Sequence, residues 1–96
     1  MRIILVYDIR IESEDDREGQ KRLRKTFKIC KKYLSRVQNS VFEGDVTEGG
    51  YRSLLSELFQ VIDKDVDNIV IYKIKFENAY EREIITNSED PTSNFI

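Results

Sequence analysis

Apolar side chains along this sequence follow two kinds of spacing, which predict strands and helices in alternation. Arg2–Ile9 is an almost unbroken, β-branched apolar run, typical of a strand in the middle of a sheet. In Gln20–Ser35 the apolar residues recur at intervals of three and four, which predicts an amphipathic helix after an exposed acidic loop. Glu48–Ile62 follows the same helical period, and Thr47 is its expected N-cap.

The other apolar segments predict short strands. Arg36–Thr47 cannot place all its apolar residues on one alternating face, so we expect two antiparallel strands with a turn or bulge between Asn39 and Gly44. Ile69–Phe76 alternates in its second half, which indicates an edge strand or a half-exposed one, and Tyr80–Thr86 is a further strand candidate. The order β-α-β-β-α-β, with an extra C-terminal strand, predicts an α+β fold of the ferredoxin-like type.

We expect one ferredoxin-like domain over residues 1–86, followed by a polar tail over 87–96. The tail ends in Phe95 and Ile96, which suggests that it docks on a surface. Both helices are used on one face of the sheet, so nothing in the chain remains to cover the other face. We therefore expect a homodimer in which a second copy covers that face and the C-terminal strands are exchanged.

Charge is distributed unevenly along the chain. The net charge is −2, yet the first predicted helix and the residue after it hold eight of the 16 basic residues and no acidic one. An ordinary solvated helix face is the simpler explanation, but the complete lack of acidic residues favours a surface that binds the phosphates of a nucleic acid. The candidate nucleic-acid-binding residues are Lys21, Arg22, Arg24, Lys25 and Lys28.

The composition excludes several kinds of chemistry. The chain has no His, so it has neither an imidazole base nor an imidazole metal ligand. Its single Cys, Cys30, lies on the apolar stripe of the first helix, where we expect a buried hydrophobe. The longest apolar run, Ile3–Tyr7, is far below the ~20 residues of a membrane span. Without a signal-peptide pattern either, we expect a cytoplasmic protein.

Asp8 is the candidate metal ligand, because a carboxylate at the end of a central apolar strand must be solvated, paired or bound to a cation. The alternative is an Asp that caps the turn after the strand. One carboxylate alone is a poor Mg²⁺ site, but a two-fold axis nearby would add a second Asp8, so that the pair could hold one Mg²⁺ or Mn²⁺. A second acidic cluster, Glu43, Asp45 and Glu48, is interpreted as surface turn residues.

Three features together resemble a known family: Val6-Tyr7-Asp8-Ile9, the basic helix, and the stretch from Arg36 to Gly44, RVQNSVFEG. The family is the second CRISPR-associated core protein (Cas-two), the small partner of the CRISPR spacer integrase. The resemblance covers about residues 1–86. It implies a ferredoxin-like homodimer with exchanged last strands and a divalent metal ion facing Asp8 of each chain. It also implies catalytic roles for Asp8, Arg36 and Phe42, although the acidic loop over Arg10–Gly19 is longer than the family usually shows.

Two functions follow from the resemblance, and we expect one homodimer to combine duplex binding with cleavage unless it is a scaffold only. The first is a non-catalytic adaptor in CRISPR spacer acquisition, which binds duplex DNA and joins the integrase. The second is a metal-dependent endonuclease that cleaves RNA or DNA at paired Asp8 residues. A third reading, without the resemblance, is a ferredoxin-like regulatory or small-ligand domain.

Overall fold

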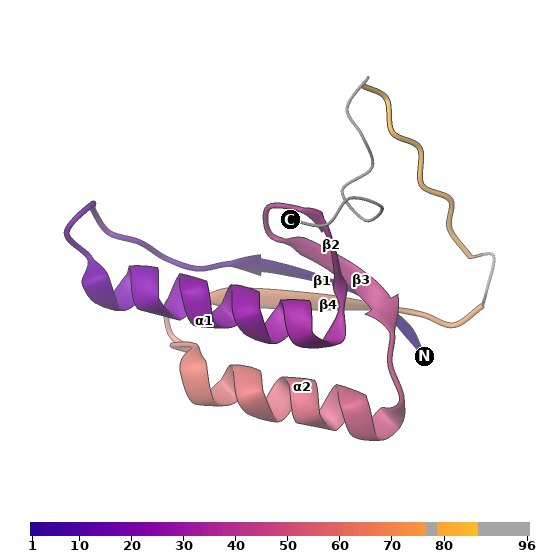
Figure 1. Cartoon of the computed structure of the whole chain (residues 1–96), viewed down its shortest axis with the longest axis horizontal. Helices are drawn as coiled ribbons and strands as arrows, with labels where there is room; N and C mark the ends of the chain where they lie inside the picture. The colour runs from indigo at the N-terminus through magenta and orange to yellow at the C-terminus, as the bar shows by residue number, and fades with distance from the viewer. Residues whose placement is uncertain (77–78, 87–96) are drawn as a thin grey trace.

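The elements of the chain follow the predicted order (Figure 1). The computed structural model describes residues 1–76 and 79–86. In this part of the chain the elements are β1 (Arg2–Asp8), α1 (Arg17–Tyr33), β2 (Ser35–Gln38), β3 (Val41–Asp45), α2 (Glu48–Val61) and β4 (Asn68–Ile74). The strands form one antiparallel sheet in the order β2-β3-β1-β4, with both helices on one face, so the ferredoxin-like prediction is confirmed.

The core lies between the helices and the sheet, because β1 alternates between the two faces. Ile3, Leu5 and Tyr7 are buried under the helices, whereas Ile4 and Val6 on the opposite face are only partly buried. The helices add their own buried apolar residues to the same cluster: Cys30, Leu34, Leu54 and Leu58. The prediction that Cys30 is a buried hydrophobe is therefore confirmed.

The face of the sheet opposite the helices carries an apolar strip. Ile4 and Val6 lie opposite Tyr72 and Val70 of β4, so all four side chains project from that face. Tyr72 is 59% exposed and Val70 41% exposed. We call these four residues the open strip. The homodimer remains a prediction, and the open strip is the apolar surface that such a contact requires.

Helix α1 begins three residues earlier than the sequence pattern predicts. Asp16 is its N-cap, and the carboxylate accepts hydrogen bonds from the backbone N–H groups of Gly19 (2.9 Å) and Glu12 (3.0 Å). These bonds hold the pKa of Asp16 below its usual value. The acidic segment expected to be loop up to Gly19 thus ends in a capped first turn that starts at Arg17, whereas the predicted Thr47 cap of α2 is confirmed.

The chain between α1 and α2 forms the two short strands that the sequence predicts. They meet at a tight turn over Asn39 and Ser40, and the pairing of β2 with β3 is irregular between Arg36 and Gln38. The predicted strand over Tyr80–Thr86 is not a strand within the single chain, which leaves its exchange with a second copy as a prediction. The predicted docking of the apolar C-terminus falls outside the described residues.

In the described part of the chain, neither helix has the length and apolar character needed to span a bilayer.

Candidate functional site

Asp8 is the last residue of β1 and is exposed. It projects from the same sheet face as the open strip, and it lies opposite Asn68 of β4. It borders an open hollow of about 410 Å³. The other residues that line this hollow are Ile9, Arg10, Ile11, Val66 and Asn68. The sequence-based placement of Asp8 at the tip of the central strand is confirmed.

The turn that joins β2 to β3 lies at the same end of β1. The backbone N–H of Tyr7 donates to the carbonyl oxygen of Ser40 (3.0 Å), and the Tyr7 hydroxyl donates to the carbonyl oxygen of Asn39 (3.3 Å). Arg36 is held at this turn, since its Nη2 donates to Asn39 Oδ1 at 2.6 Å and its guanidinium lies 5.2 Å from the centre of the Phe27 ring. The structure therefore places Arg36 at the same end of the sheet as Asp8, but on the face that the helices cover, whereas Asp8 projects from the opposite face.

Phe42 does not border this site. Its side chain is wholly buried, stacked on Tyr7 at 5.9 Å between ring centres and edge-on to Phe27 at 5.8 Å. A side chain with no exposed surface cannot touch a substrate, so the catalytic role that the resemblance implied for Phe42 stays a prediction that would have to act through the residues packed on it. Phe42 faces the helices from β3 and acts as a core residue.

The predicted basic surface divides into exposed and engaged cations. Lys21, Arg24, Lys25 and Lys28 are exposed and follow the i, i+3, i+4, i+7 pattern, which places them on one side of α1. We call these four residues the basic ridge. Arg22 is different, because its Nε contacts Asp67 Oδ2 at 2.9 Å and only 19% of its side chain is exposed.

The two C-terminal lysines of α1 also make contacts within the protein. Lys32 is ion-paired with Glu57 of α2, which also accepts a hydrogen bond from the Tyr33 hydroxyl. The ammonium group of Lys31 lies 5.6 Å from the centre of the Phe27 ring. The C-terminal turn of α1 is thereby tied to α2 and to the core.

Asp67 is not a candidate from the sequence, yet its carboxylate is fully buried at the start of β4. Burial alone would raise the pKa of Asp67, but the Asp63 backbone amide, the Arg22 guanidinium and the Arg10 backbone amide donate to the carboxylate and hold that pKa below its usual value. The only signal in the sequence is an acidic residue beside a strand end, which is common on protein surfaces.

Glu43 is not a surface turn residue, so the interpretation drawn from the sequence is wrong. Its side chain is 6% exposed, and it accepts hydrogen bonds from the Tyr80 hydroxyl (2.9 Å) and from Arg82. Arg2 approaches the same carboxylate at 3.6 Å. These contacts attach the segment after β4 to β3, and they join residues too far apart in sequence for a local pattern to reveal.

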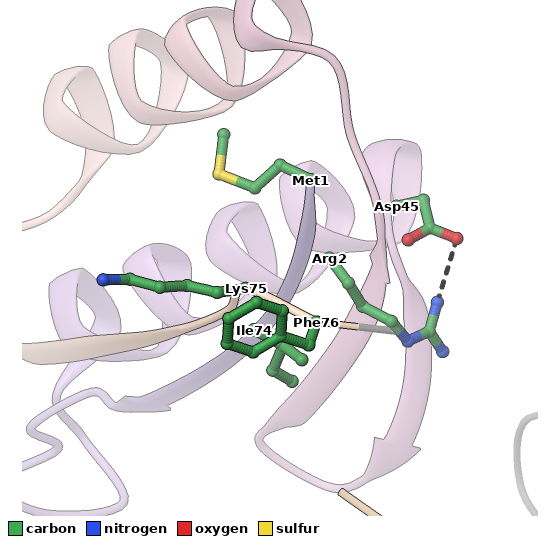
Figure 2. A pocket seen from close by; sticks show the side chains of 6 residues that line it. All are labelled: Met1, Arg2, Asp45, Ile74, Lys75 and Phe76. Atoms are coloured by element: carbon green, nitrogen blue, oxygen red, sulfur yellow. Dashed lines mark hydrogen bonds and ion pairs between the residues drawn. The ribbon is translucent and has the colours of Figure 1, made fainter. Parts of the chain in front are cut away.

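A second hollow, of about 480 Å³, lies at the opposite end of β1 (Figure 2). Figure 2 shows Arg2 ion-paired with Asp45 (3.1 Å) on one side and Phe76 on the other, with Lys75 directed away from that pair. Arg2 is already neutralised by Asp45 and Glu43, so Lys75 is the other positively charged side chain that lines this hollow.

A divalent metal site would have to be built around Asp8. Among the described residues, no group of three or more Cys, Asp or Glu side chains could hold a metal ion. One exposed carboxylate beside the Asn68 side chain fits Mg²⁺ that keeps most of its waters, since this ion is commonly held by one or two carboxylates. If Asp8 binds a metal ion, a single chain would supply one carboxylate, and a second Asp8 would supply another.

Comparison with known proteins identifies the family. The family model described as CRISPR associated protein Cas2 matches residues 1–82. The chain belongs to the Cas2 family. Among its relatives, CRISPR-associated endoribonuclease Cas2 2 of Moorella thermoacetica is 44% identical over 94 residues, which cover 98% of this chain and 100% of that protein. CRISPR-associated endoribonuclease Cas2 of Fusobacterium nucleatum is 40% identical over 96 residues, covering 100% of this chain and 87% of the relative.

A solved structure of a Cas2 protein agrees with the fold. Cas2 of Streptococcus pyogenes, crystallised at pH 6.5, superposes with a TM-score of 0.70 at 35% identity, over 86% of this chain and 99% of that one. Cas2 membership supports a role for this chain in CRISPR adaptation. The resemblance seen in the sequence is thus confirmed at the level of family and fold.

Proposed function

We propose that this Cas2 chain works in spacer acquisition as a homodimer that binds duplex DNA, joins the CRISPR integrase and cleaves RNA or DNA with Mg²⁺ or Mn²⁺ at paired Asp8 residues. The observation that carries the proposal is the exposed Asp8 carboxylate on the same sheet face as the open strip. The relatives are named endoribonucleases, which supports the nuclease part of the proposal.

The open strip supports the two-fold arrangement. Covering four apolar side chains with the same four of a second copy removes them from water, which is the main favourable term in protein association. Asp8 follows Val6 on the same face at the end of the strip. Stacking two copies about an axis near this end brings the two carboxylates towards each other.

Different residues of the chain would have different roles in cleavage. Asp8 would hold the ion, and Arg36, fixed by Asn39 at the same end of the sheet, would offer positive charge to the phosphate backbone. With no His in the chain, no imidazole can act as the base. When bound, a divalent ion would lower the pKa of a water that it holds and polarise the phosphate oxygens.

The basic ridge supports the adaptor part of the proposal. Its four exposed cations lie on one side of a 17-residue helix. Such a row suits the phosphate backbone of a duplex, and it carries no aromatic residue on which a base could stack. A dimer would carry two ridges and so present a longer positive surface.

Substituting Asp8→Asn tests the nuclease function. We expect loss of Mg²⁺-dependent cleavage of purified RNA and DNA by at least ~100-fold, because the amide keeps the shape but not the charge that holds the ion. Asp65→Asn is the matched control, since Asp65 is also an exposed aspartate and lies in the turn before β4. Cleavage by Asp8→Asn at the parent rate would refute the proposed nuclease site.

A triple charge reversal, Lys21→Glu, Lys25→Glu and Lys28→Glu, tests duplex binding. We expect weaker binding, and the salt slope should fall by about one for each phosphate that the variant no longer neutralises. The matched control reverses three exposed cations on other parts of the chain, namely Arg52, Lys64 and Lys75. If both triple variants bind a labelled duplex with the same affinity and slope as the parent, the ridge does not contact DNA.

A further inference from the structure

Arg22 and Asp67 join three parts of the chain next to the Asp8 hollow. We propose that this pair positions the walls of the hollow, so that Arg22 serves metal binding at Asp8 and does not contact nucleic acid. The inference rests on the proposed function, because it assigns a task to residues around the proposed metal ligand.

Asp67 uses both carboxylate oxygens in this arrangement. Oδ1 accepts from the backbone N–H of Arg10 at 3.0 Å, and Oδ2 accepts from the backbone N–H of Asp63 at 2.8 Å and from Nε of Arg22 at 2.9 Å. Nη2 of Arg22 also donates to the Arg10 carbonyl oxygen at 3.1 Å. The backbone of Arg10 is therefore held at both its N–H and its carbonyl.

These bonds act where the sheet can no longer hold the two chain segments together. The pairing of β1 with β4 ends at Asp8 and Asn68, and the hollow lies just beyond that pair. Arg10 lines one side, and the residues on either side of Asp67, Val66 and Asn68, line the other. One buried carboxylate thus ties together the two segments that enclose the candidate site.

Arg22 and Arg24 give a matched comparison of an engaged and an exposed arginine. They stand two positions apart on α1, and both substitutions to Gln remove one positive charge. Coulomb repulsion between like charges alone predicts that losing either arginine makes a nearby site bind a divalent cation slightly more tightly. Positioning predicts the opposite for Arg22→Gln only, so the sign of the change distinguishes the two effects.

The test is a Mn²⁺ titration of the full chain, followed by the electron paramagnetic resonance signal of free Mn²⁺. Parent, Arg22→Gln, Arg24→Gln and Asp8→Asn are compared at equal protein concentration, with circular dichroism to confirm that each is folded. We expect Arg22→Gln to bind Mn²⁺ ~10-fold more weakly, as is common when groups that orient a metal ligand are removed. Arg24→Gln should bind as the parent does or slightly more tightly.

Each outcome decides the matter. Arg22→Gln binding Mn²⁺ like the parent would overturn the positioning role while leaving the function of Asp8 intact. Asp8→Asn binding like the parent would refute the proposed metal site and this inference with it. If Arg22→Gln does not fold, Arg22→Lys keeps the charge but cannot make all the bonds of the guanidinium. In that variant we expect weaker Mn²⁺ binding and faster hydrogen exchange at the Arg10 amide, and parent values for both would overturn the inference.

Discussion

Substituting Phe42→Leu separates a structural role from a role in cleavage. Leucine keeps an apolar side chain in the wholly buried position but cannot stack on Tyr7 or meet Phe27 edge-on. Each aromatic pair contributes about 0.5–1.5 kcal/mol beyond the area it buries. We therefore expect the free energy of unfolding to fall by about 1–3 kcal/mol, out of the roughly 5–10 kcal/mol typical of a small domain.

Urea unfolding followed by circular dichroism measures this loss. For a small protein the unfolding free energy falls by about 1–3 kcal/mol per molar urea, so the midpoint should drop by roughly 1 M. Phe59→Leu is the control, because Phe59 is 58% exposed on α2 and the chemical change is the same. We expect its effect to stay within about 0.5 kcal/mol.

Cleavage by the folded variant then tests the assignment. At a temperature where Phe42→Leu is fully folded, its cleavage rate should remain within about twofold of the parent, since the side chain reaches no surface. Unchanged stability combined with lost cleavage would contradict the core assignment and return Phe42 to the catalytic residues.

Three further predictions concern buried groups. The Thr26 hydroxyl is buried with no hydrogen-bond partner among the described residues. Thr26→Val should therefore raise the unfolding free energy by about 1 kcal/mol. A clearly lower melting temperature for Thr26→Val would show instead that the hydroxyl makes a hydrogen bond. Burial raises the pKa of Cys30 to about 12. A thiol reagent at pH 8 should therefore label Cys30 only as fast as the protein unfolds. Rapid labelling of the folded protein would contradict the burial of this thiol. Folding lowers the pKa of Asp67 from 3.8, so its contribution to stability is present above that pH and is lost as the pH falls through the lower folded-state value. Below about pH 4, the unfolding free energy should therefore fall more steeply with decreasing pH in the parent than in Asp67→Asn. Equal slopes in the two proteins would refute the contribution of Asp67.

The fold could be predicted because periodicity is a local property. The apolar run of β1 and the helical spacing of α1 and α2 depend only on near neighbours, and the Thr47 cap depends on an N–H three residues away. The start of α1 is harder to predict for a related reason. A run of acidic residues resembles a loop until one of them, Asp16, is seen to accept two backbone hydrogen bonds.

The site is less predictable, since it depends on contacts between distant residues. Asp8 could be found because a charge inside an apolar strand is conspicuous. The neighbouring cations Arg22 and Arg24 look alike in the sequence, and only the partner Asp67, 45 residues away, distinguishes them. Glu43 likewise required Tyr80 and Arg82 to show that it is buried.

The open strip links the stability of this protein to its concentration. If two copies cover Val70 and Tyr72 for each other, dilution shifts the equilibrium towards separate chains that leave these side chains in water. The melting temperature should then rise with protein concentration. In a cell that makes little of this protein, a larger fraction of the chains would be monomers, which unfold more readily. Gene dosage itself would then help to set the fraction of assembled protein.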